Sequence, residues 1–226
     1  MSTARKLVIA IDGPAGSGKS TIAARLAKKL GYVNLESGAM YRALALKAME
    51  QQVSLDDGEA LRQLANGMVI ELEPHEEGNR VRLDGCDVSQ RIRAADVTAA
   101  ASRVSIHPQV REVMVKRQRA LGIQGGVVME GRDIGTAVFP NADVKIFLDA
   151  EESVRAERRA VQIGPRSTED TQRVMADLAA RDQRDRTRSA SPLVAAPDAV
   201  HVDTTHKSID EVVAEVEEIV KKVASD

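Results

Sequence analysis

The sequence predicts an α/β fold in which a parallel, doubly wound sheet is covered by helices. Short apolar runs typical of buried strands alternate with segments of helical periodicity, and this order implies right-handed crossovers between parallel strands. A length of 226 residues suits one domain with inserts better than two independent domains. Aromatic residues make up only 2% of the chain and Trp is absent, so the core must be built from aliphatic side chains.

The first two expected elements enclose a glycine-rich segment. Residues 7–11 form a continuous apolar run, which is the pattern of a strand buried on both faces. In the helix that follows, Ile22, Leu26 and Leu30 recur every four residues, and Gly31 marks the end. We therefore expect a strand, a tight loop and a helix in this order.

The rest of the chain continues the alternation, with two departures. Residues 51–106 predict an insert that contains a β-hairpin, and residues 151–186 predict a pair of helices. Ser208 and Glu211 form a capping-box signature at the start of the last helix. The other expected core elements are strands at 32–36, 127–129, 144–148 and 199–202 and helices at 38–49 and 108–121. The hairpin is expected to have strands at 68–73 and 80–84 and a turn at 75–79. The helix pair is expected at 151–163 and 168–186, with a connector at 164–166.

Charge is balanced overall but clustered locally. The net charge of -2 argues against a general nucleic-acid binder. Residues 103–119 hold five Arg or Lys residues against one acidic residue, and residues 155–188 hold nine Arg residues against six acidic ones. Each cluster is compatible with a solvated helix face, but together they favour a site for a small anion.

The cellular setting follows from cysteine usage and the first apolar run. Cys86 is the only cysteine, so an internal disulfide is impossible and a reducing compartment is favoured. The run at residues 7–11 is too short for a signal sequence or a membrane span. We expect a cytoplasmic protein with neither a nucleic-acid partner nor a membrane partner.

The loop between the first strand and helix carries a phosphate-binding pattern. Residues 13–20 read Gly-Pro-Ala-Gly-Ser-Gly-Lys-Ser and match G-x-x-x-x-G-K-[ST] in the required context. In this pattern backbone N–H groups and the helix N-terminus bind phosphate oxygens, so a glycine-rich turn without a ligand is disfavoured. We expect Lys19 to bridge β- and γ-phosphates and Ser20 to bind Mg²⁺. The expected ATP-binding residues are Gly13, Pro14, Ala15, Gly16, Ser17, Gly18, Lys19, Ser20 and Thr21.

Two further observations concern the class of nucleotide-binding protein. The chain has no N-K-x-D segment of the kind that GTPases use to read guanine. Asp149 closes the expected strand at 144–148 and could be a metal-binding carboxylate, but it also fits a helix N-cap, and we favour the cap.

Motifs beyond this loop resemble those of bacterial cytidylate kinases over almost the whole chain. They occur in the family's order at residues 36–42, 102, 108–111, 130–136 and 181–188. The resemblance implies a three-layer P-loop fold and transfer of the ATP γ-phosphoryl group to CMP or dCMP, with Mg²⁺ as cofactor. It also implies one kinase domain with a core at about 1–50, 107–155 and 187–226, a nucleoside monophosphate-binding insert with an antiparallel hairpin at about 51–106, and a short helical lid at about 156–180.

The resemblance also implies roles for individual residues. Lys19, Arg132 and Arg159 are the expected catalytic residues, with Arg155 and Arg166 as further lid candidates. The family usually carries Asp where this chain has Glu36, so no magnesium contact is assigned there. The expected acceptor residues are Ser37, Arg111, Asp133 and Arg188 for the base, Ser102, Arg181 and Asp185 for the sugar, and Arg42 and Arg132 for the phosphate, with Tyr41 beside them.

Alternatives remain at this stage. Arg132 and Asp133 could form a strand-end ion pair without a ligand. The chain could be a P-loop kinase for another nucleoside monophosphate or a small metabolite, or a regulatory module that binds ATP without transferring its phosphate. We expect a monomer.

Overall fold

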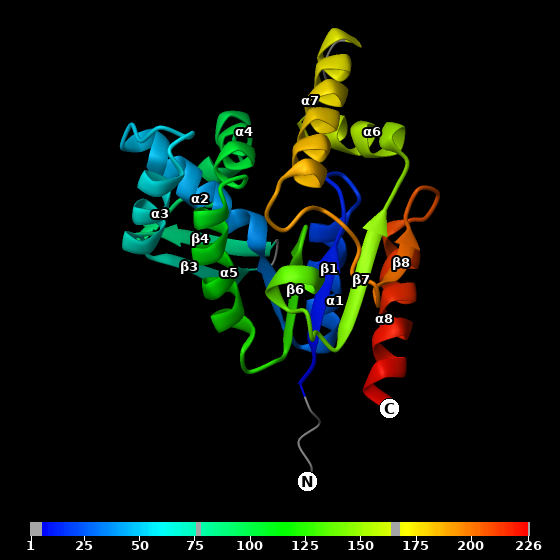
Figure 1. The fold of residues 1–226 in the computed structure, drawn as a ribbon. Coiled ribbons are helices and arrows are strands. Elements are labelled where there is room, and N and C mark those ends of the chain that lie inside the picture. The colour runs from blue at the N-terminus through cyan, green and yellow to red at the C-terminus, as the bar shows by residue number, and fades with distance from the viewer. Residues whose placement is uncertain (1–5, 76–77, 164–167, 226) are drawn as a thin grey trace.

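The computed structural model describes residues 6–75, 78–163 and 168–225. Figure 1 shows two lobes side by side, one built on the central sheet and the other on helices α2 to α5 with a small sheet. Within the described residues, five parallel strands form the central sheet in the order β2-β6-β1-β7-β8. The strands are β1 (Val8–Asp12), β2 (Val33–Glu36), β6 (Val127–Gly131), β7 (Val144–Asp149) and β8 (Val200–Asp203). The prediction of a parallel, doubly wound sheet is confirmed.

Successive side chains along each strand point to opposite faces of this sheet. Ile9 and Ile11 of β1 pack on one face with α1 (Lys19–Leu30) and α8 (Ile209–Ser225). Ala10 between them belongs to the opposite face, with β6 and the π-helical turn η2 (Ile134–Val138). This period of two is what a strand buried on both faces requires.

The second lobe has a core of its own. It joins α2 (Ser37–Glu50) and α5 (Pro108–Gly122), which flank the expected insert in sequence, to helices and strands within the insert. The apolar face of α2 is nearly all Ala, Leu and Met, so neighbouring helices approach closely. The packed unit is therefore larger than residues 51–106. The insert contributes α3 (Gly58–Gly67), the 3-10 turn η1 (Arg91–Arg93), α4 (Ala95–Val104), and the antiparallel strands β3 (Ile70–His75), β4 (Gly78–Leu83) and β5 (Cys86–Asp87).

The remaining helices stand at the carboxyl edge of the sheet. The pair α6 (Glu152–Ile163) and α7 (Thr168–Thr187) rises above the ends of the strands in Figure 1. The expected connector at 164–166, with the lid candidate Arg166, lies outside the described residues, as do Glu76 and Glu77 of the hairpin turn. Along the described stretches, no helix combines the length and apolarity needed to cross a membrane.

Candidate active site

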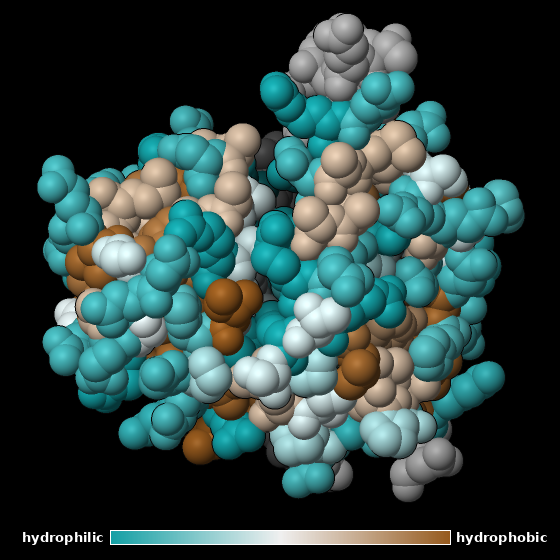
Figure 2. Space-filling view, turned by 45° about the horizontal axis from the view of Figure 1, so that its top comes forward, coloured by the Kyte–Doolittle hydropathy of each residue, from teal (hydrophilic) through white to brown (hydrophobic). Residues whose placement is uncertain are grey.

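A cavity of about 660 Å³ opens between the two lobes at the carboxyl edge of the central sheet. In Figure 2, hydrophilic side chains flank the furrow that separates the lobes. Of the described residues, nine basic and five acidic side chains line this cavity. The cavity is therefore suited to an anionic ligand. Its basic residues are Lys19, Arg42, Arg111, Arg132, Arg158, Arg159, Arg181, Arg188 and Lys207, and its acidic residues are Glu36, Glu130, Asp133, Glu157 and Asp185.

The glycine-rich loop between β1 and α1 forms one wall of the cavity. Gly13 has a φ of 148°, and a Cβ atom there would lie 2.0 Å from the carbonyl oxygen of Leu148. Gly16 has a φ of 80°, and its Cβ would lie 2.7 Å from the carbonyl oxygen of Arg155. Only glycine fits at these two positions. The sequence motif thus produces a tight loop that ends at the N-terminus of α1.

Lys19 lies buried in this loop. Its ammonium group donates hydrogen bonds to the carbonyl oxygen of Pro14 and, at 3.3 Å, to Ser17 Oγ. Burial, reinforced by the nearby Arg132, lowers the pKa of Lys19 to about 7. A phosphate group beside Lys19 would supply the negative charge that stabilises its protonated form.

Side chains outside the motif hold the loop in place. Arg155 donates to the carbonyl oxygens of Ala15 and Ala150, both at 3.0 Å, and pairs with Asp182 of α7. Because these groups occupy its guanidinium, Arg155 braces the loop and does not face the cavity, contrary to its expected part in the lid. On the other side, Arg158 donates to the hydroxyl and carbonyl oxygens of Thr204, whose hydroxyl donates to the carbonyl oxygen of Ser17.

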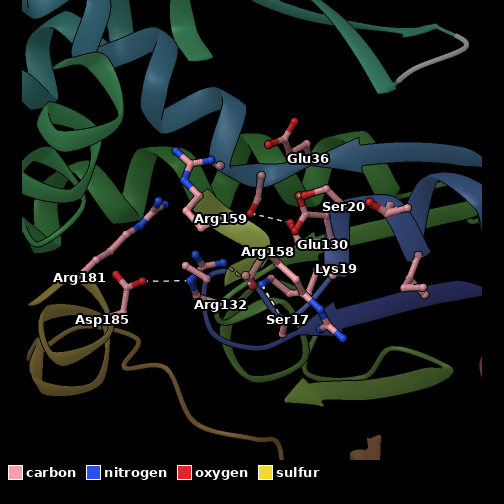
Figure 3. A pocket seen from close by; sticks show the side chains of 18 of the residues that line it. Ser17, Lys19, Ser20, Glu36, Glu130, Arg132, Arg158, Arg159, Arg181 and Asp185 are labelled. Carbon is pink, nitrogen blue, oxygen red and sulfur yellow. Dashed lines mark hydrogen bonds and ion pairs between the residues drawn. The ribbon is translucent and has the colours of Figure 1, made fainter. Parts of the chain in front are cut away.

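Glu130, to which sequence reasoning gave no role, lies at the end of β6 beside the loop. Its carboxylate accepts a hydrogen bond of 2.9 Å from the hydroxyl of Ser20, as Figure 3 shows. Burial, and then the charge of Glu36, raises the pKa of Glu130. The sequence signal that could have identified Glu130 is its position as a carboxylate near the end of β6, the strand next to β1. Asp149, the carboxylate considered for this place, does not line the cavity, and it accepts instead from the N–H of Ala150 at 2.9 Å.

The side chains expected to read a base meet on the opposite wall. Arg111 of α5 pairs with Asp133, and Nη2 of Arg188 lies 3.6 Å from the other oxygen of Asp133. The Arg111 guanidinium lies over the Tyr41 ring, 5.3 Å from its centroid. Ser37 donates to the carbonyl oxygen of Glu130 at 2.8 Å. These residues come from α2, α5 and the segments that follow β6 and α7, and all of them line one cavity.

A second group of arginines lies between that wall and the loop. Arg132 donates to Asp185 at 2.9 Å, and Arg42 pairs with Glu36 at 2.5 Å. Among the described residues, no carboxylate forms an ion pair with Arg181. Burial of Arg181, reinforced by the charge of Arg132, lowers its pKa to about 10. Burial, and then Arg42, lowers the pKa of Arg159. Figure 3 shows Arg132, Arg159 and Arg181 reaching the same space from the segment after β6, from α6 and from α7.

Several buried donors that line the cavity have no hydrogen-bond partner among the described residues. A buried donor without a partner costs about 1–3 kcal/mol, so their convergence favours a ligand rich in acceptor oxygens. They are Tyr41 Oη, Arg42 Nε, Arg111 Nε, Arg181 Nε and Arg188 Nη2.

One residue without an expected role, Arg184, contacts Ser102, one of the residues that are expected to bind the sugar. Ser102 of α4 lines the cavity near Arg181 and Asp185 of α7. Its hydroxyl accepts a hydrogen bond of 3.0 Å from Nε of Arg184, which connects the two helices. Arg186 of the same helix is exposed.

Asp12, at the end of β1, should make stability depend on pH. Burial raises the pKa of Asp12 to about 7, against the effect of hydrogen bonds from Gly135 and Ile134. The folded protein then binds this proton more tightly than the unfolded chain, so the contribution of Asp12 to stability falls as the pH rises from about 4 to about 7. Relative to Asp12→Asn, which is uncharged throughout, the wild type should lose up to about 1.4 kcal/mol of unfolding free energy per pH unit.

Urea unfolding of the two proteins at several pH values between about 5 and 8 measures this difference. Above pH 7 the difference should become constant. A difference that grows in favour of the wild type as the pH rises would contradict the expectation.

Comparison with known proteins identifies the family of the chain. The family described as cytidylate kinase matches residues 9–222. The chain is 51% identical to a cytidylate kinase of Geobacillus sp. (strain WCH70), over 95% of this chain and 96% of that protein. It is 49% identical to one of Enterococcus faecalis (strain ATCC 700802 / V583), over 96% of each chain.

A solved structure of a gluconokinase from Sinorhizobium meliloti 1021 has the same fold, with a TM-score of 0.52 and 16% identity over 98% of this chain and 95% of that one. The match to the cytidylate kinase family covers most of the chain, from β1 to α8. The chain belongs to the cytidylate kinase family.

Proposed function

We propose that the protein transfers the γ-phosphoryl group of ATP to CMP or dCMP, forming CDP or dCDP. One observation carries this proposal: a loop of backbone N–H groups and a group of arginines face each other across one cavity. Cytidylate kinases about 50% identical over nearly the whole chain support the same reaction. A module that only holds ATP has no need of the second, arginine-lined anion site.

ATP is the donor and binds the loop at residues 13–21. Lys19 contacts its β- and γ-phosphates, and Mg²⁺ binds beside Ser20. The donor set suits Mg²⁺, since a hydroxyl and the carboxylate of Glu130 are hard oxygen groups. No cluster of three metal-binding side chains occurs in the described ranges, so phosphates and water would complete the coordination, as is usual for Mg²⁺. When bound, the ion neutralises charge on the phosphates.

CMP binds the opposite wall. Asp133 accepts from the exocyclic amine of cytosine, while Arg111 and Arg188 donate to its ring acceptors and Ser37 lies at the edge of the base. UMP presents a carbonyl oxygen in place of that amine, so it would leave Asp133 facing another acceptor. Ser102, Arg181 and Asp185 contact the sugar, and the orphaned hydroxyl of Tyr41 supplies a further donor.

Catalysis comes from position and charge. Arg42 and Arg132 hold the acceptor phosphate in line with the γ-phosphate, and Lys19, Arg132 and Arg159 stabilise the three oxygens of the phosphoryl group in transit. No general base is needed, because a phosphate monoester with a second pKa of about 6 is already an anion at neutral pH.

Residues 51–106 serve as the acceptor-binding insert and residues 156–180 as the lid. Arg159 supports the second assignment, since it reaches the cavity from α6. The protein acts as a monomer in this proposal, since one chain supplies residues for both walls of the cavity. The protein works in the cytoplasm, where ATP and CMP are available and a lone, exposed Cys86 stays reduced.

An assay of ADP release over a panel of acceptors tests this function. With Mg²⁺ and ATP, CMP and dCMP should be turned over with kcat/KM at least about 100-fold above that for UMP or AMP, since mismatched polar groups in a buried site reject an analogue strongly. Turnover should stop when EDTA removes Mg²⁺ and return with excess Mg²⁺. Faster turnover of UMP, AMP or a hydroxyl metabolite such as shikimate would refute the assignment.

A further inference from the structure

Asp12 makes a contact that the reaction scheme above does not use. It is the last residue of β1, only 4% exposed, and directly precedes the phosphate loop. One carboxylate oxygen accepts from the N–H of Ile134 at 2.8 Å, and the other accepts from the N–H of Gly135 at 2.7 Å. Both oxygens of one carboxylate are thus bound to two successive amides more than 120 residues away.

Those amides begin the π-helical turn η2. Within the turn the N–H of Phe139 donates to the carbonyl oxygen of Ile134 at 2.6 Å, and the first amides of any helical turn lack partners inside it. The residue at the cap position, Asp133, makes no side-chain hydrogen bond to the turn. Asp12 caps the turn in its place, which leaves the carboxylate of Asp133 for Arg111 and Arg188.

We infer that Asp12 is a positioning residue for base recognition: by fixing the start of η2 it sets where the carboxylate of Asp133 stands. This inference rests on the proposed function, in which Asp133 reads cytosine. Packing supports it, because a Cβ atom at Gly135 would lie 3.4 Å from Asp12 Oδ2 and 3.3 Å from Lys145 Cδ. The turn therefore lies close against the carboxylate.

Asp12→Asn tests the inference, because the variant is isosteric but places an N–H donor against one of the two amides. The turn must then move away. We expect KM for CMP to rise roughly tenfold and the ratio of kcat/KM for CMP to that for UMP to fall by a similar factor. KM for ATP should stay within about twofold, although Asp12 adjoins Gly13 of the phosphate loop.

Asp143→Asn is the matched control. Asp143 also accepts from an amide of β1, that of Val8 at 2.7 Å, but at the opposite end of the strand. Its variant should lose stability without a change in the CMP to UMP ratio. Asp12→Ser, which has no amide donor, provides a second variant and should repeat the loss of discrimination.

The inference fails if Asp12→Asn and Asp12→Ser keep the wild-type ratio, or if KM for ATP rises as much as KM for CMP. It also fails if both variants do not fold while Asp143→Asn does, since the carboxylate would then serve the fold and not the base. These outcomes are distinct from failure of the proposed function, in which the wild-type protein itself would not prefer CMP.

Discussion

Replacement of Lys19 by methionine is expected to lower kcat for CMP phosphorylation by at least about 10³-fold, as loss of a transition-state cation does in phosphoryl transfer. The ammonium lies buried at the head of α1 and lines the cavity. Methionine retains the flexible apolar stem and removes the charge and the N–H donors of the ammonium. The variant loses the hydrogen bonds of the ammonium to Pro14 and Ser17, but it also removes a buried charge whose burial lowers the pKa of Lys19 to about 7. The stability of the ligand-free protein should therefore change little.

A coupled assay of ADP release with saturating CMP and ATP measures kcat, and circular dichroism checks the fold. Lys28→Met is the control, since Lys28 is an exposed lysine on the same helix. It should behave as the wild type. Turnover by Lys19→Met within about tenfold of the wild type would place the phosphoryl-transfer site elsewhere.

Arg111→Ala should remove CMP recognition and spare ATP binding. Arg111 is 3% exposed and pairs with Asp133, so truncation takes away the proposed ligand of the base and leaves a carboxylate whose nearest partner is gone. Breaking a buried ion pair at a binding site costs about 2–5 kcal/mol, so kcat/KM for CMP should fall by at least about 30-fold. KM for ATP should be unchanged, because the phosphate loop lies on the other wall.

Isothermal titration with CMP and with a non-hydrolysable ATP analogue separates the two sites. Arg117→Ala is the control on the same helix, since Arg117 binds the carbonyl oxygens of Met68 and Asn66 and does not line the cavity. Equal weakening of both ligands by Arg111→Ala would mean that Arg111 supports the fold of the site and does not read the base.

Mainly apolar runs predicted the three inner strands of the central sheet, β1, β6 and β7. The edge strands β2 and β8 carry polar residues between the apolar ones and were predicted from shorter patterns. The capping box at Ser208 and Glu211 is present as expected, with a hydrogen bond of 2.8 Å from the Ser208 N–H to the Glu211 carboxylate. Helices α3 and α4 were not predicted. The sequence signal for α3 was the N-cap Asp57, whose side chain accepts from the N–H groups of Glu59 and Ala60. Its buried residues, Leu61 and Ala65, lie four positions apart on one face of the helix, so the sequence carried a second signal for α3.

The phosphate loop could be located from sequence because its residues are contiguous and its geometry is local. Residues of the opposite wall came from a resemblance, and the structure brings them together in one cavity. Contacts such as Asp12 with Ile134, or Arg155 with Ala15, join positions more than 100 residues apart. No spacing pattern records such pairs, so the residues that hold the site in shape were found only in the structure.

The bracing of the phosphate loop has a thermodynamic consequence. Arg155 donates to the carbonyl oxygen of Ala15, and Arg158 holds Thr204, whose hydroxyl donates to the carbonyl oxygen of Ser17. Gly13 lies against β7 and Gly16 against α6. The conformational entropy of the loop is therefore lost during folding and not when the triphosphate arrives. Association with the donor then requires little ordering on this side of the cavity, so its free energy reflects mainly the match between anion and cation.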